Sequence, residues 1–245
     1  MKNCSLVGSR ASGVRASHIL SRSVITAMAI GGLVAGSVGC GGGNSSEARV
    51  RVFHASPDAP AVDVLIDGGR VLENVPYTAA SDFLPVEAKK SRVQVNVAGT
   101  DTTAIDATLE LADNTDYLIV AADKVANITP LVLTADRSHP EAGFAKVRVL
   151  HSAASAPSVD VYVTAPGNGI SSAAPVLSNV PFKAISDYLT VPAGTYDVAV
   201  TVAGTKTVAI QAPGLTVVDG LVATVAALDA VGGGAPFSLA VLDER

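Results

Sequence analysis

The sequence predicts an all-β protein made of two tandem immunoglobulin-like β-sandwich domains. Three observations lead to this prediction. A unit of nearly one hundred residues occurs twice, many short segments alternate polar and apolar residues, and turn residues separate those segments at regular intervals. Short alternating segments at such spacing are typical of sandwiches and barrels.

The repeat is clearest in two pairs of segments. "VRVFHASPDAPAVDV" (residues 50–64) matches "VRVLHSAASAPSVDV" (147–161), and "NVPYTAASDFLPV" (74–86) matches "NVPFKAISDYLTV" (179–191). The second copy carries an insertion between its two segments. A repeat of this length is a domain and not a solenoid unit.

The pattern within each copy is that of β-strands. "RVRVFHA" and "RVQVNVAG" alternate with period two, and β-branched residues, which favour strands, are abundant. Turn signals such as "SPDAP", "DGG" and "AGTD" punctuate them. We expect a first sandwich over residues 49–135, a linker rich in charge, Pro and Gly over 136–145, and a second sandwich over 146–245.

One segment resembles a known corner of immunoglobulin-like sandwiches. In "VPAGTYDVAV" a turn precedes Tyr196, which opens an alternating strand, as in the tyrosine corner. The first copy reads "VEAKKSRVQV" there and lacks the Tyr. The corner is therefore expected in the second copy only.

The first 39 residues differ from the rest. They contain four basic and no acidic residues, followed by an apolar stretch, "VITAMAIGGLVAGSVG" (24–39). The stretch is shorter than the roughly 20 residues of a transmembrane helix. A basic start and a short apolar core predict a secretory signal peptide over residues 1–39.

"CGGGNSSEA" follows and resembles the cleavage site of bacterial lipoproteins, although Ser37 stands where that class prefers Leu. The resemblance implies that Cys40 becomes the lipidated first residue, with residues 40–48 as lipid attachment site and flexible tether. Cys4 would be removed, so no intramolecular disulfide is expected. Gly41 favours the outer membrane where a cell has one, with the sandwiches periplasmic or surface-facing.

The charge excludes one class of partner. The chain has 17 basic and 22 acidic residues, and removing four basic residues with the signal leaves 13 against 22, a net charge of −9. An acidic domain has no electrostatic reason to bind nucleic acid.

The duplicated polar residues allow two interpretations. If the strands flanking "ASPDAPAV" form a hairpin, His54 and Asp63 would face each other across it. With Ser81 or Asp82 they would resemble a hydrolase triad. The other interpretation is structural, a His that binds a carboxylate or loop carbonyls and holds a Pro-containing loop; we favour it, since no G-x-S-x-G motif is present. The loop of the first copy also contains Pro60. The second copy repeats the same residues as His151, Pro157, Asp160, Ser186 and Asp187.

Other ligands have little sequence support. No H-E-x-x-H, C-x-x-C or nucleotide-binding glycine motif occurs, so no metal or cofactor is expected. The chain has no Trp, and most of its five Tyr and five Phe lie at strand positions that suit a core, so the sequence carries no signal for a sugar ligand but does not exclude one. The longer loop over residues 164–178 is the one feature without an evident structural role. Loops on rigid sandwiches often carry binding sites, but a tolerated insertion is the commoner explanation of such a loop, and we favour it.

"VRVFHASPDAPAVDVLIDG", "NVPYTAASDFLPV" and "VPAGTYDVAV" resemble domain-of-unknown-function family 4397, in two tandem copies. The resemblance implies an exported bacterial domain and names no ligand. We therefore expect a non-enzymatic envelope lipoprotein that binds an envelope or extracellular ligand, mediates adhesion or has a structural role. The alternative is a hydrolase that uses the His–Asp–Ser set.

Overall fold

The computed structural model describes residues 46–245. Apart from one 3₁₀ turn, η1 (Val125–Asn127), its regular elements are β-strands, and the predicted all-β fold of two tandem sandwiches is confirmed. The first repeat contains β1 (Glu47–Ala55), β2 (Val62–Ile66), β3 (Gly69–Val75), β4 (Leu84–Glu87), β5 (Lys90–Val97), β6 (Thr103–Glu110), β7 (Asp116–Ala122) and β8 (Thr129–Thr134). The second contains β9 (Phe144–His151), β10 (Val159–Thr164), β11 (Leu177–Val180), β12 (Leu189–Pro192), β13 (Gly194–Val202), β14 (Val208–Val217), β15 (Val222–Leu228) and β16 (Ser238–Asp243).

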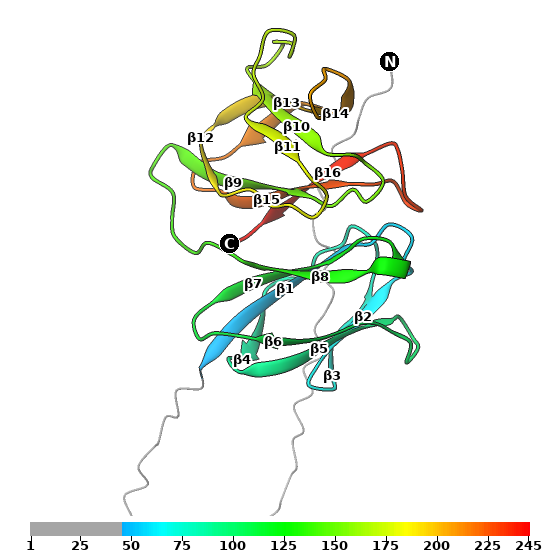
Figure 1. Ribbon diagram of the computed structural model, residues 1–245. Helices are drawn as coiled ribbons and strands as arrows, with labels where there is room; N and C mark the ends of the chain where they lie inside the picture. The colour runs from blue at the N-terminus through cyan, green and yellow to red at the C-terminus, as the bar shows by residue number, and fades with distance from the viewer. Residues whose placement is uncertain (1–45) are drawn as a thin grey trace, which may run out of the picture.

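Each repeat forms two four-stranded sheets with the same topology (Figure 1). The strand orders are β4-β1-β7-β8 and β3-β2-β5-β6 in the first repeat, and β12-β9-β15-β16 and β11-β10-β13-β14 in the second. β1 pairs in parallel with β7, and β9 with β15, whereas the other pairs are antiparallel. The duplicated sequence therefore folds twice in the same way.

The two strands that flank "ASPDAPAV" do not form a hairpin. β1 pairs with β4 and β7 in one sheet, and β2 pairs with β3 and β5 in the other. The chain between β1 and β2 therefore crosses from one sheet to the other. Alternation along a segment identifies a strand and its buried face, but it does not identify the strand's partner.

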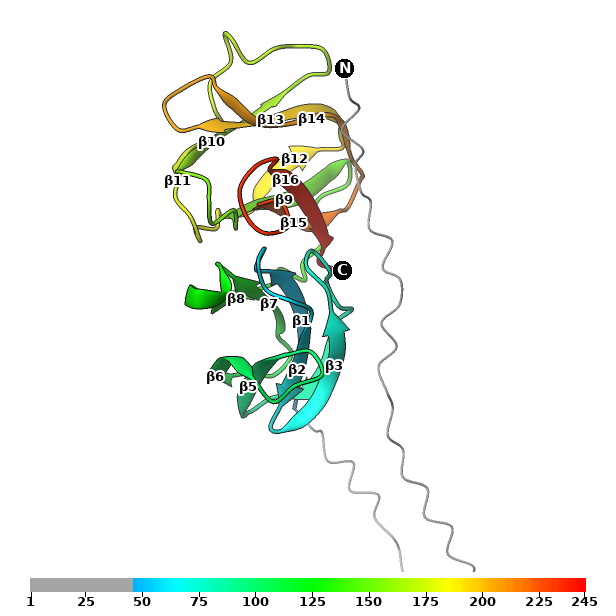
Figure 2. The same cartoon turned by 90° about the vertical axis from the view of Figure 1, so that its right-hand side faces the viewer.

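The four sheets stack as successive layers, which the two perpendicular views show (Figures 1 and 2). The sheets that contain β1 and β9 are the inner layers, and those that contain β2 and β10 are the outer ones. One apolar core lies inside the first sandwich and another inside the second. A third lies between the inner sheets and joins the two repeats.

This third core, which we call the shared core, comes from the alternation of the inner strands. Val50 and Val52 of β1 face the core of the first sandwich, whereas Phe53 faces the second repeat. Phe53, Leu118 and Leu150 are each 0% exposed. The shared core consists of Phe53, Ala55, Leu118, Val120, Ala122, Leu150, Ala226, Leu228 and Leu242.

Buried polar contacts extend the same interface. The Arg148 guanidinium donates to Glu244 Oε1 at 2.8 Å, to Thr224 Oγ1 at 2.8 Å and, across the interface, to the carbonyl oxygen of Thr134 at 3.0 Å. The Tyr188 hydroxyl also donates to Glu244. The charges of Arg148 and Glu244 are thus paired where both side chains are almost fully buried, as buried ions require.

The shared core predicts that the repeats unfold together. Phe53→Ala should lower the free energy of unfolding by about 3–5 kcal/mol, the usual cost of removing a buried Phe side chain. Urea denaturation followed by circular dichroism should show one transition that moves as a whole. Val208→Ala, at a side chain 44% exposed, is the control and should change stability by less than about 0.5 kcal/mol. Two transitions of which only one moves would contradict a shared core.

Candidate functional site

The duplicated His residues hold the loops that follow β1 and β9. Both rings are 0% exposed. Nε2–H of His54 donates to the carbonyl oxygen of Pro60 at 3.0 Å, and Nε2–H of His151 donates to that of Pro157 at 3.0 Å. Because a carbonyl oxygen only accepts, Nε2 carries the proton. The Ser56 N–H donates to Nδ1 of His54 at 3.3 Å, so that ring is neutral.

Burial lowers the pKa of both His54 and His151 below the usual 6.5. The hydrogen bonds to the proline carbonyls act in the opposite direction but are weaker. Both rings are therefore neutral at physiological pH. A neutral imidazole whose N–H is bound to a loop carbonyl serves as a structural tie.

The duplicated Asp residues hold two other turns. Asp63 is buried, and its carboxylate accepts the backbone N–H of Asn74 at 2.8 Å and of Gly99 at 3.2 Å. Asn74 has φ +53°, a left-handed conformation that Asn tolerates better than most residues. The "NVP" and "VAGT" motifs thus recur because each supplies one donor to this carboxylate. The corresponding residues of the second repeat are Asp160, Asn179 and Gly204, at 2.7 and 2.8 Å.

The serines of the hydrolase alternative are likewise bound to the backbone. The Ser81 hydroxyl accepts the N–H of Val52 at 3.0 Å and donates to the carbonyl of Asp82 at 2.7 Å. In the second repeat, the same bonds join Ser186 to Val149 (2.9 Å) and Asp187 (2.8 Å).

The His, Asp and Ser side chains do not form a triad within the described residues. His54 lies on the same face of β1 as Val50 and Val52, which line the core between the sheets. Asp63 lies between two core valines of β2 and points to the opposite face of its sheet. The carboxylate and the imidazole are therefore on opposite sides of a sheet.

The tyrosine corner expected in the second repeat is present. The Tyr196 hydroxyl donates to the carbonyl oxygen of Pro192, four residues upstream, at 2.8 Å. At the matching position of the first repeat Ser91 bonds to Asp67 instead. As for metals, no three His, Cys, Asp or Glu side chains gather anywhere in residues 46–245.

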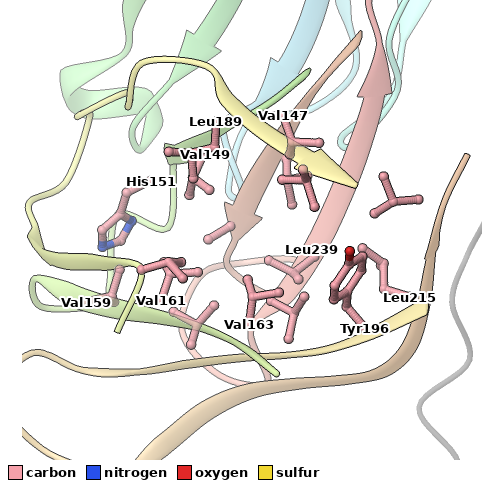
Figure 3. Close-up of a pocket in the computed structure, with 17 residues that line it drawn as sticks. Val147, Val149, His151, Val159, Val161, Val163, Leu189, Tyr196, Leu215 and Leu239 are labelled. Atoms are coloured by element: carbon pink, nitrogen blue, oxygen red, sulfur yellow. The ribbon is translucent and has the colours of Figure 1, made fainter. Parts of the chain in front are cut away.

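The second sandwich contains a hollow of about 80 Å³ between its two sheets (Figure 3). His151 lies at one end of the hollow, and Tyr196 and Leu215 at the other. Its lining is otherwise aliphatic. The lining residues are Val147, Val149, His151, Val159, Val161, Val163, Val176, Leu189, Val191, Tyr196, Val198, Val200, Leu215, Val217, Val225, Ala227 and Leu239.

The first sandwich has the same architecture but differs at several of the matched lining positions. Val50 is 1% exposed, whereas the matching Val147 is half-buried. At one matched lining position the second repeat has the larger side chain, Tyr196 in place of Ser91, and at three others it has a side chain one methylene smaller. These pairs, first repeat before second, are Ile66 and Val163, Leu111 and Val217, and Ile119 and Val225.

The hollow lowers stability unless something occupies it. At about 24 cal/mol per Å³, an unfilled space of this size costs on the order of 2 kcal/mol relative to a filled core. The residues of the first repeat would restore the missing methylenes. At these three positions the second repeat therefore carries smaller side chains than its own fold can accommodate.

The longer loop of the second repeat is fixed beside the half-buried end of the hollow. The Asp197 carboxylate, next to Tyr196 on β13, accepts the N–H groups of Gly167 and Gly214, both at 2.8 Å. Lys206 Nζ donates to two loop carbonyls, those of Ile170 and Ala173, at 2.8 and 2.7 Å. The loop therefore has a defined conformation.

Comparison with known proteins agrees with the motifs. A family model described as "Domain of unknown function (DUF4397)" matches residues 48–162 and 167–245, which is most of the chain. The chain belongs to the DUF4397 family. The two segments agree with two tandem copies, as the repeated motifs indicate. The residues between the two segments, 163–166, cover the end of β10 and the start of the longer loop of this DUF4397 protein.

Two solved structures overlap it weakly. A carbohydrate-binding module (family CBM26) of Eubacterium rectale Amy13K, in complex with maltoheptaose, is 10% identical, with 81% of this chain and 97% of that chain covered and a TM-score of 0.26. A putative cell adhesion protein of Bacteroides fragilis is 8% identical, with 80% and 98% covered and a TM-score of 0.22. Both TM-scores are too low to indicate a shared fold. Among curated proteins, none matches significantly.

The sequence-based interpretation missed the hollow and the partners of the Asp residues. The repeated "NVP" and "VAGT" motifs were visible but had no assigned role. The Ile-to-Val and Leu-to-Val differences were also visible between the copies, although only the fold shows that they face one interior. Cys40 lies outside the described residues, and within residues 46–245 no helix is long and apolar enough to cross a bilayer.

The lowered pKa of both His residues predicts a loss of stability in acid. Unfolded His binds a proton near pH 6.5, whereas the folded rings do so only at lower pH, so their contribution is complete above pH 6.5 and decreases below it. Below pH 6.5 the free energy of unfolding should fall by at most about 1.4 kcal/mol per pH unit for each His. Urea denaturation between pH 7.5 and 5.5 measures it.

The matched variant carries His54→Gln and His151→Gln, which keep an N–H donor and remove the titration. Its free energy of unfolding should fall less steeply over the same pH range. An unchanged slope would contradict the assignment of the acid sensitivity to these two rings.

Proposed function

We propose that this protein is an exported, non-catalytic envelope lipoprotein, anchored through Cys40, whose two sandwiches form a binding module. The observation that carries the binding role is the apolar hollow of the second repeat, lined in part by three side chains smaller than their counterparts in the first repeat.

The non-catalytic part of the proposal is supported by the use of the duplicated polar groups. His54 and His151 bind loop carbonyls, Asp63 and Asp160 bind backbone N–H groups, and the matching serines bind the backbone. Each group therefore has a structural role that accounts for its recurrence. None of these roles requires a substrate.

The anchoring part is supported by the sequence that precedes the first strand. The apolar stretch ends at Cys40, and six residues separate that Cys from Glu47, where β1 begins. Even fully extended, such a tether spans at most about 25 Å. An acylated Cys40 would therefore keep both sandwiches close to the membrane surface, and Gly41 favours the outer membrane.

The anchor predicts a specific loss. In cells that express the full chain, Cys40→Ser should abolish incorporation of a fatty-acid probe and move the protein from the membrane fraction to the soluble one. The control is Cys4→Ser, which changes the other Cys of the chain and should leave labelling and fractionation unchanged. Label retained by Cys40→Ser, with the protein still in the membrane fraction, would refute the anchor.

The binding role is tested separately with the Cys40→Ser chain immobilised and exposed to envelope extract. A component that is retained by the protein and absent from the bare support is expected. Failure to retain any component would overturn the binding role and leave the anchor intact.

A further inference from the structure

We infer that the hollow of the second sandwich binds the end of a saturated hydrocarbon chain. The inference deepens the proposed binding role and rests on it. It concerns the chemical class of the ligand, which the family match does not give.

The lining offers no hydrogen-bonding partner to a ligand. Only His151 and Tyr196 among the lining residues have polar side-chain atoms. Nε2–H of His151 is bound to the Pro157 carbonyl and the Tyr196 hydroxyl to that of Pro192. Nδ1 of His151 has no partner but is fully buried, so it presents no surface to the hollow. A ligand group with donors or acceptors would be buried there unpaired, which is unfavourable.

Water does not suit the hollow for the same reason. A space of about 80 Å³ is several times the roughly 10–15 Å³ that one water molecule requires, but a buried water also needs about two to four polar partners. Apolar hollows of this kind stay dry and take up apolar molecules. An apolar ligand is therefore the favoured occupant.

The volume of the hollow favours a hydrocarbon chain over an aromatic ring as the ligand. A hollow of about 150 Å³ accommodates benzene, and this one is about half as large. The three smaller side chains, Val163, Val217 and Val225, each open the space of one methylene relative to the first repeat. The natural replacement for missing methylenes is a short run of methylenes from a ligand.

The hollow also has a direction that suits a chain. At its closed end His151 is 0% exposed and Val159 only 3%, whereas at the other end Tyr196 and Leu215 are half-buried (Figure 3). A chain that enters from the Tyr196 end would place its methyl end toward His151. Its polar head would remain outside, beside the fixed longer loop.

The test uses unbranched alcohols from 1-butanol to 1-octanol and the full chain carrying Cys40→Ser, with binding measured by calorimetry and by methyl NMR of the valines. Affinity should rise about fourfold for each added CH₂ until the hollow is filled and then level off. The largest shifts should come from lining valines such as Val163 and Val225. Benzene should bind at least about tenfold more weakly than the best alcohol.

A reciprocal pair of variants makes the test specific. Val163→Ile, Val217→Leu and Val225→Ile together should weaken alcohol binding at least about tenfold and raise the melting temperature. Ile66→Val, Leu111→Val and Ile119→Val in the first repeat should lower the melting temperature and create a second, weak site. Alcohol binding unchanged by the filling variant, absence of chain-length dependence, or equal affinity for benzene would overturn the inference. None of these results would bear on the proposed binding role, because the retention of envelope components by the immobilised protein tests that role separately.

Discussion

The packing of the two inner sheets against each other determines how the rest of this molecule is arranged. Phe53, Leu118 and Leu150 are buried between the repeats, and burial of apolar surface is the dominant favourable contribution to folding. Strands β7 and β15, in the middle of these sheets, must then be apolar on both faces, since each face meets a core. Their sequences, "DYLIVAA" and "VATVAAL", are almost continuously apolar for this reason. The two repeats therefore form one folded unit.

The same layering explains which polar residues recur. In each repeat the chain passes from an inner to an outer sheet directly after its first strand, through a loop in which a proline supplies no N–H donor. His54 and His151 stabilise this crossing from the side of the core. Asp63 and Asp160 stabilise two turns on the other face of the outer sheet. The copies thus kept these residues because both repeats make the same crossing between layers.

The sequence was sufficient for the fold class, the two copies and the tyrosine corner at Tyr196, because each depends on local periodicity or on neighbouring residues. It left open whether His54 binds a carboxylate or a loop carbonyl, and the structure shows the carbonyl of Pro60. A hairpin of β1 and β2, which the sequence allowed, does not form, because partner choice depends on strands far apart in the chain. The shared core was missed because the face of β1 that carries Arg51 and Phe53 reads as a solvent-exposed face when one repeat is considered alone. The hollow depends on which valines face one another, and only the fold determines that.

Fusion of two similar sandwiches also makes the hollow tolerable. The cost of an unfilled space of about 80 Å³ is on the order of 2 kcal/mol, a large share of the roughly 5–15 kcal/mol by which a typical domain is stable. In this molecule the second sandwich also gains stability from the shared core, including Leu150 and Leu228, and from the buried Arg148–Glu244 pair. These contacts lie on the opposite face of the inner sheet from the hollow. The loss of three methylenes on one face therefore leaves the contacts on the other face intact, and one copy can differ in its interior from the other.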